Sequence, residues 1–164
     1  MSSVYVRKRR ESKYEPIIHA ETLRDELIEF AKREYGIRDP KTLVRKKYVI
    51  RKNSDDYDFY LAVLYEHRRE INQRLILLID DLYSANAIYP TTAEEFDRRR
   101  EFLNIALARC SIILKELQEI VNMYDVDLNT HKRYQEMIDR EIDLIKRWRQ
   151  RDNRLKARLN KGIV

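Results

Sequence analysis

Residues of the types that usually carry out acid–base, nucleophilic or metal chemistry are scarce in this sequence. Its 164 residues include three histidines and one cysteine. A di-metal carboxylate site in a helical bundle uses Glu-x-x-His pairs that project inward from facing helices. The residues three positions before the histidines are Pro16, Leu64 and Leu128, so this motif is missing. We therefore predict that the chain has no metal site.

The histidines and the cysteine also lack the spacing of a nuclease or of a cysteine enzyme. One class of helical nuclease places an arginine a few residues before a catalytic histidine, and no arginine stands there before His19, His67 or His131. We expect His67 and His131 to lie at the surface. Cys110 has helical spacing with Ile113, which favours a buried small hydrophobic residue over a nucleophile because no nearby histidine would lower its pKa.

Two other patterns that can indicate catalysis are weak in this chain. Asp80 and Asp81 are adjacent, and neighbouring positions of a helix point about 100° apart, so their carboxylates would not converge on one ion. The sequence has 2 glycines, too few for a glycine-rich phosphate loop. We predict a protein without catalytic activity and without a cofactor.

Basic residues are the remaining candidates for function, and they are concentrated in three segments. The chain has 34 Lys and Arg against 28 Asp and Glu. Residues 1–16, 38–54 and 146–164 carry net charges of +3, +6 and +7, whereas residues 55–131 carry −7. Solvated helix ends are one explanation, since the macrodipole favours cations near helix C-termini. Three clusters in one small chain favour an anionic partner, above all nucleic acid.

We predict that the basic residues of these segments contact nucleic acid. The candidates are Arg7, Lys8, Arg9, Arg10, Arg45, Lys46, Lys47, Arg51, Lys52, Arg147, Arg149, Arg151, Arg154 and Arg158. No element offers an obvious way to read base edges. Binding should therefore depend on phosphates and weaken strongly as the salt concentration rises.

Two further features lie close to these basic residues. Trp148 could stack on a base, but we favour the interpretation that it anchors the end of its helix in the core. The triplet Arg98, Arg99 and Arg100 faces three sides of a helix. We expect at least one of these arginines to pair with a nearby glutamate, and the triplet to serve a protein interface rather than RNA.

The spacing of apolar residues predicts the elements that position these side chains. Apolar residues recur every three or four positions in four predicted helices, at about 16–35, 57–87, 92–123 and 131–158. Short connections force long neighbouring helices to be antiparallel. The predicted fold is all-α, an up-and-down antiparallel four-helix bundle over residues 16–164, preceded by a basic flexible arm at residues 1–15. The basic segment 41–53 is predicted to be a loop or a short helix.

Helix starts are marked by capping residues. Ser54 is the expected N-cap of the second helix. The third helix is expected to begin with a capping box, and the alternatives are Thr91 with Glu94 or Thr92 with Glu95. The candidate caps of the last helix are Asn129 and Thr130.

Other properties of the sequence bear on location. No apolar run is long enough to span a membrane, and the first residues lack the apolar stretch of a signal peptide. The single cysteine, Cys110, cannot form an internal disulfide, which is typical of a reducing compartment. We expect a cytoplasmic protein that does not bind membranes.

Three stretches of the chain resemble a known family. They are residues 84–96 (SANAIYPTTAEEF) with the arginine triplet that follows, residues 125–129 (DVDLN) and residues 148–153 (WRQRDN). These are similar to the accessory variability determinant (Avd) proteins of diversity-generating retroelements, four-helix bundles encoded beside reverse transcriptases. The resemblance covers roughly residues 55–158. It implies a barrel-like homopentamer that binds a reverse transcriptase and its template RNA or cDNA, in support of mutagenic cDNA synthesis.

The residues and the resemblance together predict a non-enzymatic accessory subunit that binds nucleic acid. Each protomer would supply a few phosphate contacts, and a ring would multiply them through effective concentration. One alternative is a structural oligomeric adaptor of the same bundle family, without a direct role in nucleic-acid binding. Another is an unrecognised nuclease or nucleotide-handling enzyme.

Overall fold

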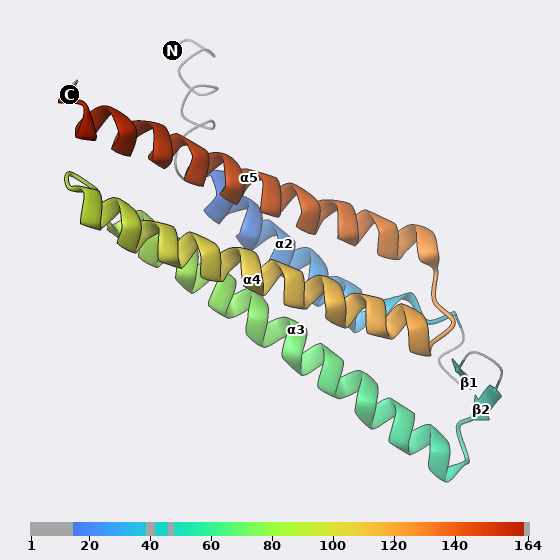
Figure 1. The fold of residues 1–164 in the computed structure, drawn as a ribbon. Coiled ribbons are helices and arrows are strands. Elements are labelled where there is room, and N and C mark those ends of the chain that lie inside the picture. The colour runs from blue at the N-terminus through green and yellow to red at the C-terminus, as the bar shows by residue number, and fades with distance from the viewer. Residues whose placement is uncertain (1–14, 39–41, 46–47, 163–164) are drawn as a thin grey trace, which may run out of the picture.

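Four helices pack against one another as an up-and-down antiparallel bundle, which confirms the predicted fold class (Figure 1). The computed structural model describes residues 15–38, 42–45 and 48–162. The helices are α2 (Glu15–Lys32), α3 (Asp55–Ala87), α4 (Ala93–Met123) and α5 (Leu128–Asn160). Because residues 1–14 lie outside the described part of the chain, the predicted basic arm does too, except for Glu15, which begins α2.

The first helix is shorter than predicted and ends in an unusual turn. It ends at Lys32 rather than near residue 35 and is followed by the 3-10 helix η1 (Glu34–Gly36). Glu34, Tyr35 and Gly36 have φ angles of 49°, 55° and 71°, so the chain turns through three left-handed residues in succession. Only glycine adopts this conformation readily. Tyr35 is held there because its side chain is 1% exposed, packed edge-on against Phe30.

The caps of α3 and α4 agree with the sequence, whereas the cap of α5 differs. The hydroxyl of Ser54 accepts a hydrogen bond from the amide of Tyr57 at the start of α3. Of the two possible capping boxes, Thr92 with Glu95 is the one present. The predicted caps Asn129 and Thr130 of α5 are wrong: both donate to the carboxylate of Asp127, which is the N-cap. These hydrogen bonds lower the pKa of Asp127.

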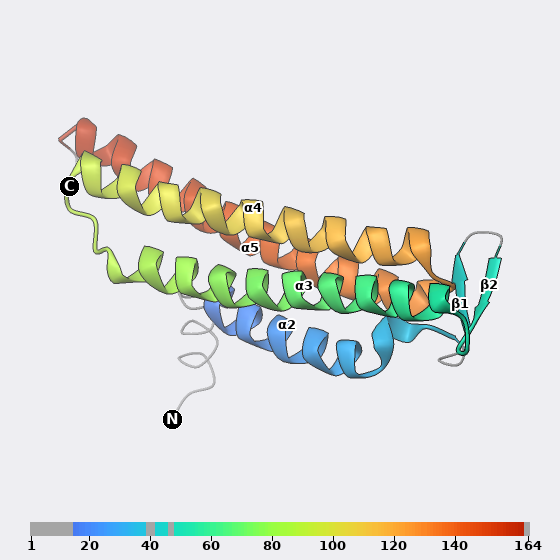
Figure 2. The ribbon, with the colours of Figure 1, turned by 90° about the horizontal axis from the view of Figure 1, so that it is seen from below.

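The basic segment between α2 and α3 is a β-hairpin, so the predicted loop or short helix is wrong. Strands β1 (Thr42–Arg45) and β2 (Tyr48–Arg51) pair in antiparallel register, with Val44 opposite Val49. β-Branched residues at these positions favour strands, which explains the difference. The hairpin sits at the end of the bundle where α2 ends and α3 begins (Figure 2). Ile50, 7% exposed, joins the hairpin to the core.

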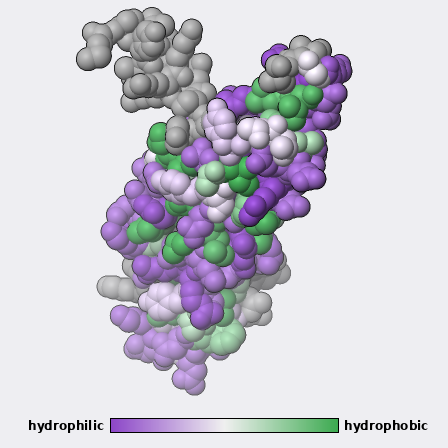
Figure 3. All heavy atoms as spheres, turned by 90° about the vertical axis from the view of Figure 1, so that its left-hand side faces the viewer, coloured by the Kyte–Doolittle hydropathy of each residue, from purple (hydrophilic) through white to green (hydrophobic). Residues whose placement is uncertain are grey.

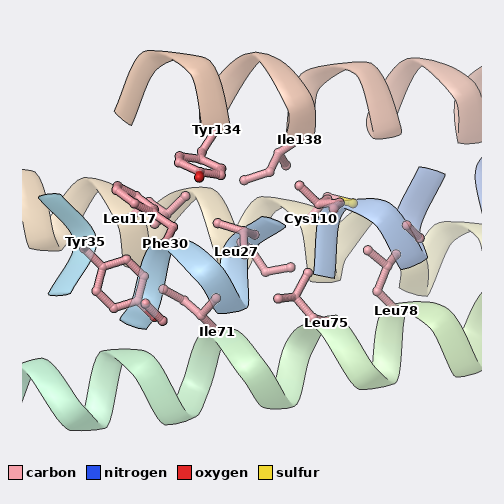
Figure 4. Close-up of a cluster of buried hydrophobic side chains, with 14 of the residues drawn as sticks. Leu27, Phe30, Tyr35, Ile71, Leu75, Leu78, Cys110, Leu117, Tyr134 and Ile138 are labelled. Carbon is pink, nitrogen blue, oxygen red and sulfur yellow. The ribbon is translucent and has the colours of Figure 1, made fainter. Parts of the chain in front are cut away.

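The core of the bundle is apolar and continuous. Side chains from all four helices meet in it, among them Leu27, Leu75, Cys110 and Ile138 (Figure 4). Cys110 is fully buried, as predicted, and burial raises the pKa of its thiol well above its usual value. Each of these positions falls on the apolar stripe of its helix.

Some residues of the predicted apolar stripes lie outside the core. Tyr65 of α3 and Ile105 of α4 are 50% and 42% exposed. The buried face of each of these helices is therefore narrower than the spacing of its apolar residues predicts.

The short α2 leaves part of α5 without a neighbour from the first helix. Glu15, the first residue of α2, lies 3.9 Å from Arg140, and His19 contacts Glu141. α5 continues for a further twenty residues after Arg140, in antiparallel contact with the beginning of α4. We call residues 88–104, which form the α3–α4 connection and the start of α4, together with residues 147–160 of α5, the distal end of the bundle (left-hand side of Figure 1). In the described chain, none of the helices is both long and apolar enough to cross a membrane.

Candidate nucleic-acid interface

The predicted cationic residues do not form one continuous surface. Arg51, the last residue of β2, and Lys52, which follows it, are exposed. The basic part of α5 lies at the distal end, which Figure 1 shows at the opposite end of the bundle. A helix of the length of α5 spans about 50 Å. Several of the other candidates fall outside the described residues: Arg7, Lys8, Arg9, Arg10, Lys46 and Lys47. Arg45 belongs to β1, and only its backbone is described.

Four of the predicted residues form a straight cationic stripe on α5. They are Arg147, Arg151, Arg154 and Arg158, and all four are exposed. Their spacing of four, three and four residues places them within an arc of about 60° on one face, over a length of about 16 Å. Within the described residues, no carboxylate lies within ion-pair distance of any of them. The stripe is therefore a row of positive charge that the bundle itself does not neutralise.

The other basic residues of this segment have a different role. The guanidinium of Arg149 donates a hydrogen bond of 2.8 Å to the side-chain carbonyl of Asn104, and its side chain is half-buried. Lys156 pairs with Asp97 at 2.5 Å. Both side chains connect α5 to α4, so Arg149, predicted as a nucleic-acid contact, faces the partner helix rather than the stripe.

Arg99 contradicts the prediction that the whole arginine triplet serves a protein interface. It is 2% exposed, and one of its amino groups donates to both carboxylate oxygens of Asp152, at 3.0 and 3.2 Å. Its other amino group donates to the backbone carbonyl of Ile88 in the α3–α4 connection. The guanidinium also lies over the ring of Trp148, 5.8 Å from its centroid. A side chain buried in this way cannot reach a partner protein, whereas Arg98 and Arg100 are exposed and remain predicted interface residues.

Trp148 belongs to the same buried cluster. Its side chain is 3% exposed, which confirms the favoured interpretation of a core anchor. Stacking of Trp148 on a base would require that it leave the core.

Burial of Asp152 leaves the surface of residues 146–162 without an exposed acidic side chain. Asp152 is the only acidic residue among residues 146–164 and is 5% exposed. A buried carboxylate needs a cation and hydrogen bonds to offset its lost hydration, and Arg99 supplies both. The negative charge is therefore neutralised inside the distal end, while the arginines of the stripe face solvent.

The histidines are structural, and the prediction that His131 lies at the surface is wrong. His131 is 6% exposed, and its Nε2 atom lies 2.8 Å from the carbonyl oxygen of Tyr35. His67, half-buried, contacts Glu116 at 2.7 Å and so joins α3 to α4. Each histidine thus connects two elements, and burial lowers the pKa of His131. Among the described residues, no group of three or more histidine, cysteine or acidic side chains is arranged to hold a metal ion.

His19 pairs with a completely buried carboxylate, that of Glu141. Nδ1 of His19 lies 2.7 Å from Oε2 of Glu141, whose side chain is completely buried. The other carboxylate oxygen of Glu141, Oε1, has no hydrogen-bond partner among the described residues. Burial raises the pKa of Glu141, while the hydrogen bond from His19 opposes that shift.

Sequence reasoning missed Arg99, Asp152 and Glu141 as buried residues, although their positions carried a signal. Arg99 stands three residues after Phe96 and four before Leu103, on the apolar stripe of α4. Asp152 and Glu141 likewise occupy the apolar stripe of α5. A charged residue at such a position indicates a buried partner on another helix.

Comparison with protein-family models, curated proteins and solved structures finds no match to this chain. The strongest local feature is the cationic stripe of Arg147, Arg151, Arg154 and Arg158.

Proposed function

We propose that this protein is a non-enzymatic accessory subunit that binds nucleic acid and holds template RNA or cDNA for a retroelement reverse transcriptase. The observation that carries the proposal is the stripe of four arginines on α5, exposed and without a carboxylate within ion-pair distance in the described chain. Arginines in a row suit successive phosphates, because each guanidinium binds a phosphate oxygen through a charge-assisted hydrogen bond. The Avd resemblance supports the choice of a reverse transcriptase as partner.

Self-association is part of the proposal and would strengthen binding. One protomer offers four contacts on the stripe, and a ring of protomers, such as the pentamer that the resemblance implies, would place several stripes on one polynucleotide. Exposed large apolar side chains on the outer side of α3 give a surface for such contacts. They are Tyr65, Ile76 and Tyr83, each at least half exposed.

The test is a salt titration of RNA binding. For a labelled single-stranded RNA measured by fluorescence anisotropy, four phosphate contacts predict a slope of about −3 for log K against log salt concentration. Raising the salt from 50 to 200 mM should weaken binding about 50-fold on that slope. Replacing all four arginines of the stripe by glutamine should remove most of this dependence.

A matched control variant loses the same four positive charges at positions outside the stripe. Lys32, Arg69, Lys115 and Lys132 are exposed cations, each within ion-pair distance of a carboxylate. Their replacement by glutamine should leave RNA affinity within about 2-fold of the wild type. Equal loss in both variants would show a general charge effect and would contradict a defined site.

The alternative functions give different results. A structural adaptor should bind no RNA even at low salt, and this outcome would overturn the proposal. RNA cleavage in the presence of a divalent metal, lost in a point variant, would instead show an enzyme. Binding of the purified reverse transcriptase, by the wild type and by variants of Arg98 and Arg100, tests the polymerase contact.

A further inference from the structure

The apolar stripe of α5 continues past the point where α2 stops covering it. Leu144 and Trp148, on this stripe, are 7% and 3% exposed. Leu155, seven residues after Trp148 and therefore on nearly the same line of the helix, is 41% exposed. α2 begins beside Arg140, and Arg99 of α4 lies over the ring of Trp148 two turns further along α5. No described helix covers Leu155 from the side of α2.

This apolar position lies directly beside the cationic stripe. Leu155 follows Arg151 by one helical turn and is adjacent in sequence to Arg154, so it borders the arginines on the side toward the core. Figure 3, which looks onto the distal end, shows hydrophobic surface among the hydrophilic side chains.

An aromatic side chain is brought to the same end by the buried cluster. Arg99 binds the carbonyl of Ile88 with one amino group and Asp152 with the other, so the α3–α4 connection is fixed against α5. Tyr89, the next residue, is 75% exposed, the highest exposure among the large apolar and aromatic side chains of the described chain. The distal end therefore combines a row of arginines with Leu155 and Tyr89.

We propose that the distal end binds single-stranded rather than duplex nucleic acid, with phosphates on the arginine stripe and bases against Leu155 and Tyr89. This inference rests on the proposed function and specifies its ligand. Only a single strand has bases free to pack on aromatic and apolar side chains, because a duplex keeps its bases stacked inside. Contacts of this kind tolerate any sequence, because every base has a face that can stack.

The experiment compares three probes with equal numbers of phosphates. They are a single-stranded RNA, an RNA duplex and a single-stranded sugar-phosphate oligomer that lacks bases. The wild type should bind the single-stranded RNA about 10-fold more tightly than either other probe, as expected for one or two stacked bases. The double variant Tyr89→Ala/Leu155→Ala should bind all three probes equally, with the salt slope unchanged.

The control variant removes an aromatic residue and a leucine elsewhere. Phe59 and Leu128 are 63% and 60% exposed and lie outside the distal end. The variant Phe59→Ala/Leu128→Ala should keep the preference for single-stranded RNA. Circular dichroism of both variants checks that the bundle is folded.

The outcomes separate this inference from the proposed function. If no probe binds at low salt, the proposed function fails. If all probes bind equally to the wild type and only the arginine variant loses affinity, the proposed function stands and the single-strand inference is overturned. If Leu155→Ala instead dissociates an oligomer and leaves RNA affinity unchanged, a second copy covers this surface, which also overturns the inference.

Discussion

The four-helix section and the distal end of this bundle are held together by different interactions. Where α2 is present, the helices meet mostly through apolar and aromatic side chains, such as Phe30, which stacks on Tyr134 with ring centroids 4.1 Å apart. The completely buried carboxylate of that section, Glu141, pairs with a histidine rather than with an arginine. Beyond the start of α2, a buried ion pair between Arg99 and Asp152 joins α4 to α5. A helix with fewer neighbours has less apolar surface to bury. At the distal end, the buried ion pair replaces part of the apolar contact between helices. Because that pair takes up the carboxylate of Asp152, the exposed face of α5 there stays cationic.

The largest effect should come from the four-helix section. Phe30→Ala removes a fully buried ring that contacts Tyr35, His131 and Tyr134. The lost burial and the cavity should lower the free energy of unfolding by about 4 kcal/mol. Urea denaturation followed by circular dichroism measures the change. Ile18→Ala, on the same helix but 57% exposed, is the control and should change stability by less than about 0.5 kcal/mol.

The second prediction concerns the ion pair of the distal end. Arg99→Met leaves Asp152 buried without its cation, which should cost about 3 kcal/mol of unfolding free energy. The double variant Arg99→Met/Asp152→Leu removes both charges and should recover most of that loss. Urea denaturation of both variants gives the comparison. Equal losses in the single and double variants would mean that the pair itself, rather than a buried carboxylate that has lost Arg99, determines stability.

The positions of the four long elements could be predicted from the sequence, but the ion pair could not. Apolar residues that recur every three or four positions, such as Leu75 in α3 and Ile138 in α5, identify a helix from its own sequence. The caps Ser54 and Thr92 mark the starts of α3 and α4. Arg99 and Asp152 are separated by 53 residues, and their pairing depends on the register between two helices. One sequence does not specify that register, so Arg99 was assigned to an interface that its burial excludes.

The hairpin and the cationic stripe also show which features local sequence predicts and which depend on contacts between helices. Val44 and Val49 carried a strand signal that their basic neighbours obscured. The stripe of Arg147, Arg151 and Arg154 needed only helical spacing, so the sequence already contained it. What the sequence could not supply was which residues of α4 Asp152 and Arg149 contact, since this depends on where α4 lies.

The third prediction uses the His19–Glu141 pair, which joins α2 to α5 within the four-helix section. Burial raises the pKa of Glu141 in the folded protein above its ordinary value of 4.5. The carboxyl group of Glu141 therefore binds a proton more tightly in the folded state than in the unfolded state. The stability that protonation contributes is complete below about pH 4.5 and is lost as the pH rises through the raised pKa.

Glu141→Gln should remove this pH dependence, because the amide stays neutral. Between pH 4.5 and 7.5 the variant should gain stability relative to the wild type, by about 1.4 kcal/mol for each unit by which the pKa is raised. Urea midpoints at the two pH values measure it. Glu29→Gln, at an exposed position of the same bundle section, should show no such gain. A relative gain at low pH instead would contradict the direction of the shift.

The smallest effect on stability should come from the arginine stripe, and its sign distinguishes a structural role from a binding role. Three pairs of like charge stand three or four residues apart, namely Arg147–Arg151, Arg151–Arg154 and Arg154–Arg158. Each pair should destabilise the helix by about 0.2–0.5 kcal/mol at low salt, which the favourable position of Arg158 near the C-terminus of α5 offsets in part. Replacing all four arginines by glutamine should therefore leave stability unchanged or raise it by about 0.5 kcal/mol.

Urea denaturation at low and high salt measures this change, which should vanish at high salt because the repulsion is screened. A loss of more than about 1 kcal/mol at low salt would mean that the arginines hold the distal end together, as Arg99 does. A row of charges that contributes no stability, next to a buried ion pair that is costly to break by removing one partner, is the arrangement expected when the outer charges serve a polyanion and the inner ones serve the fold.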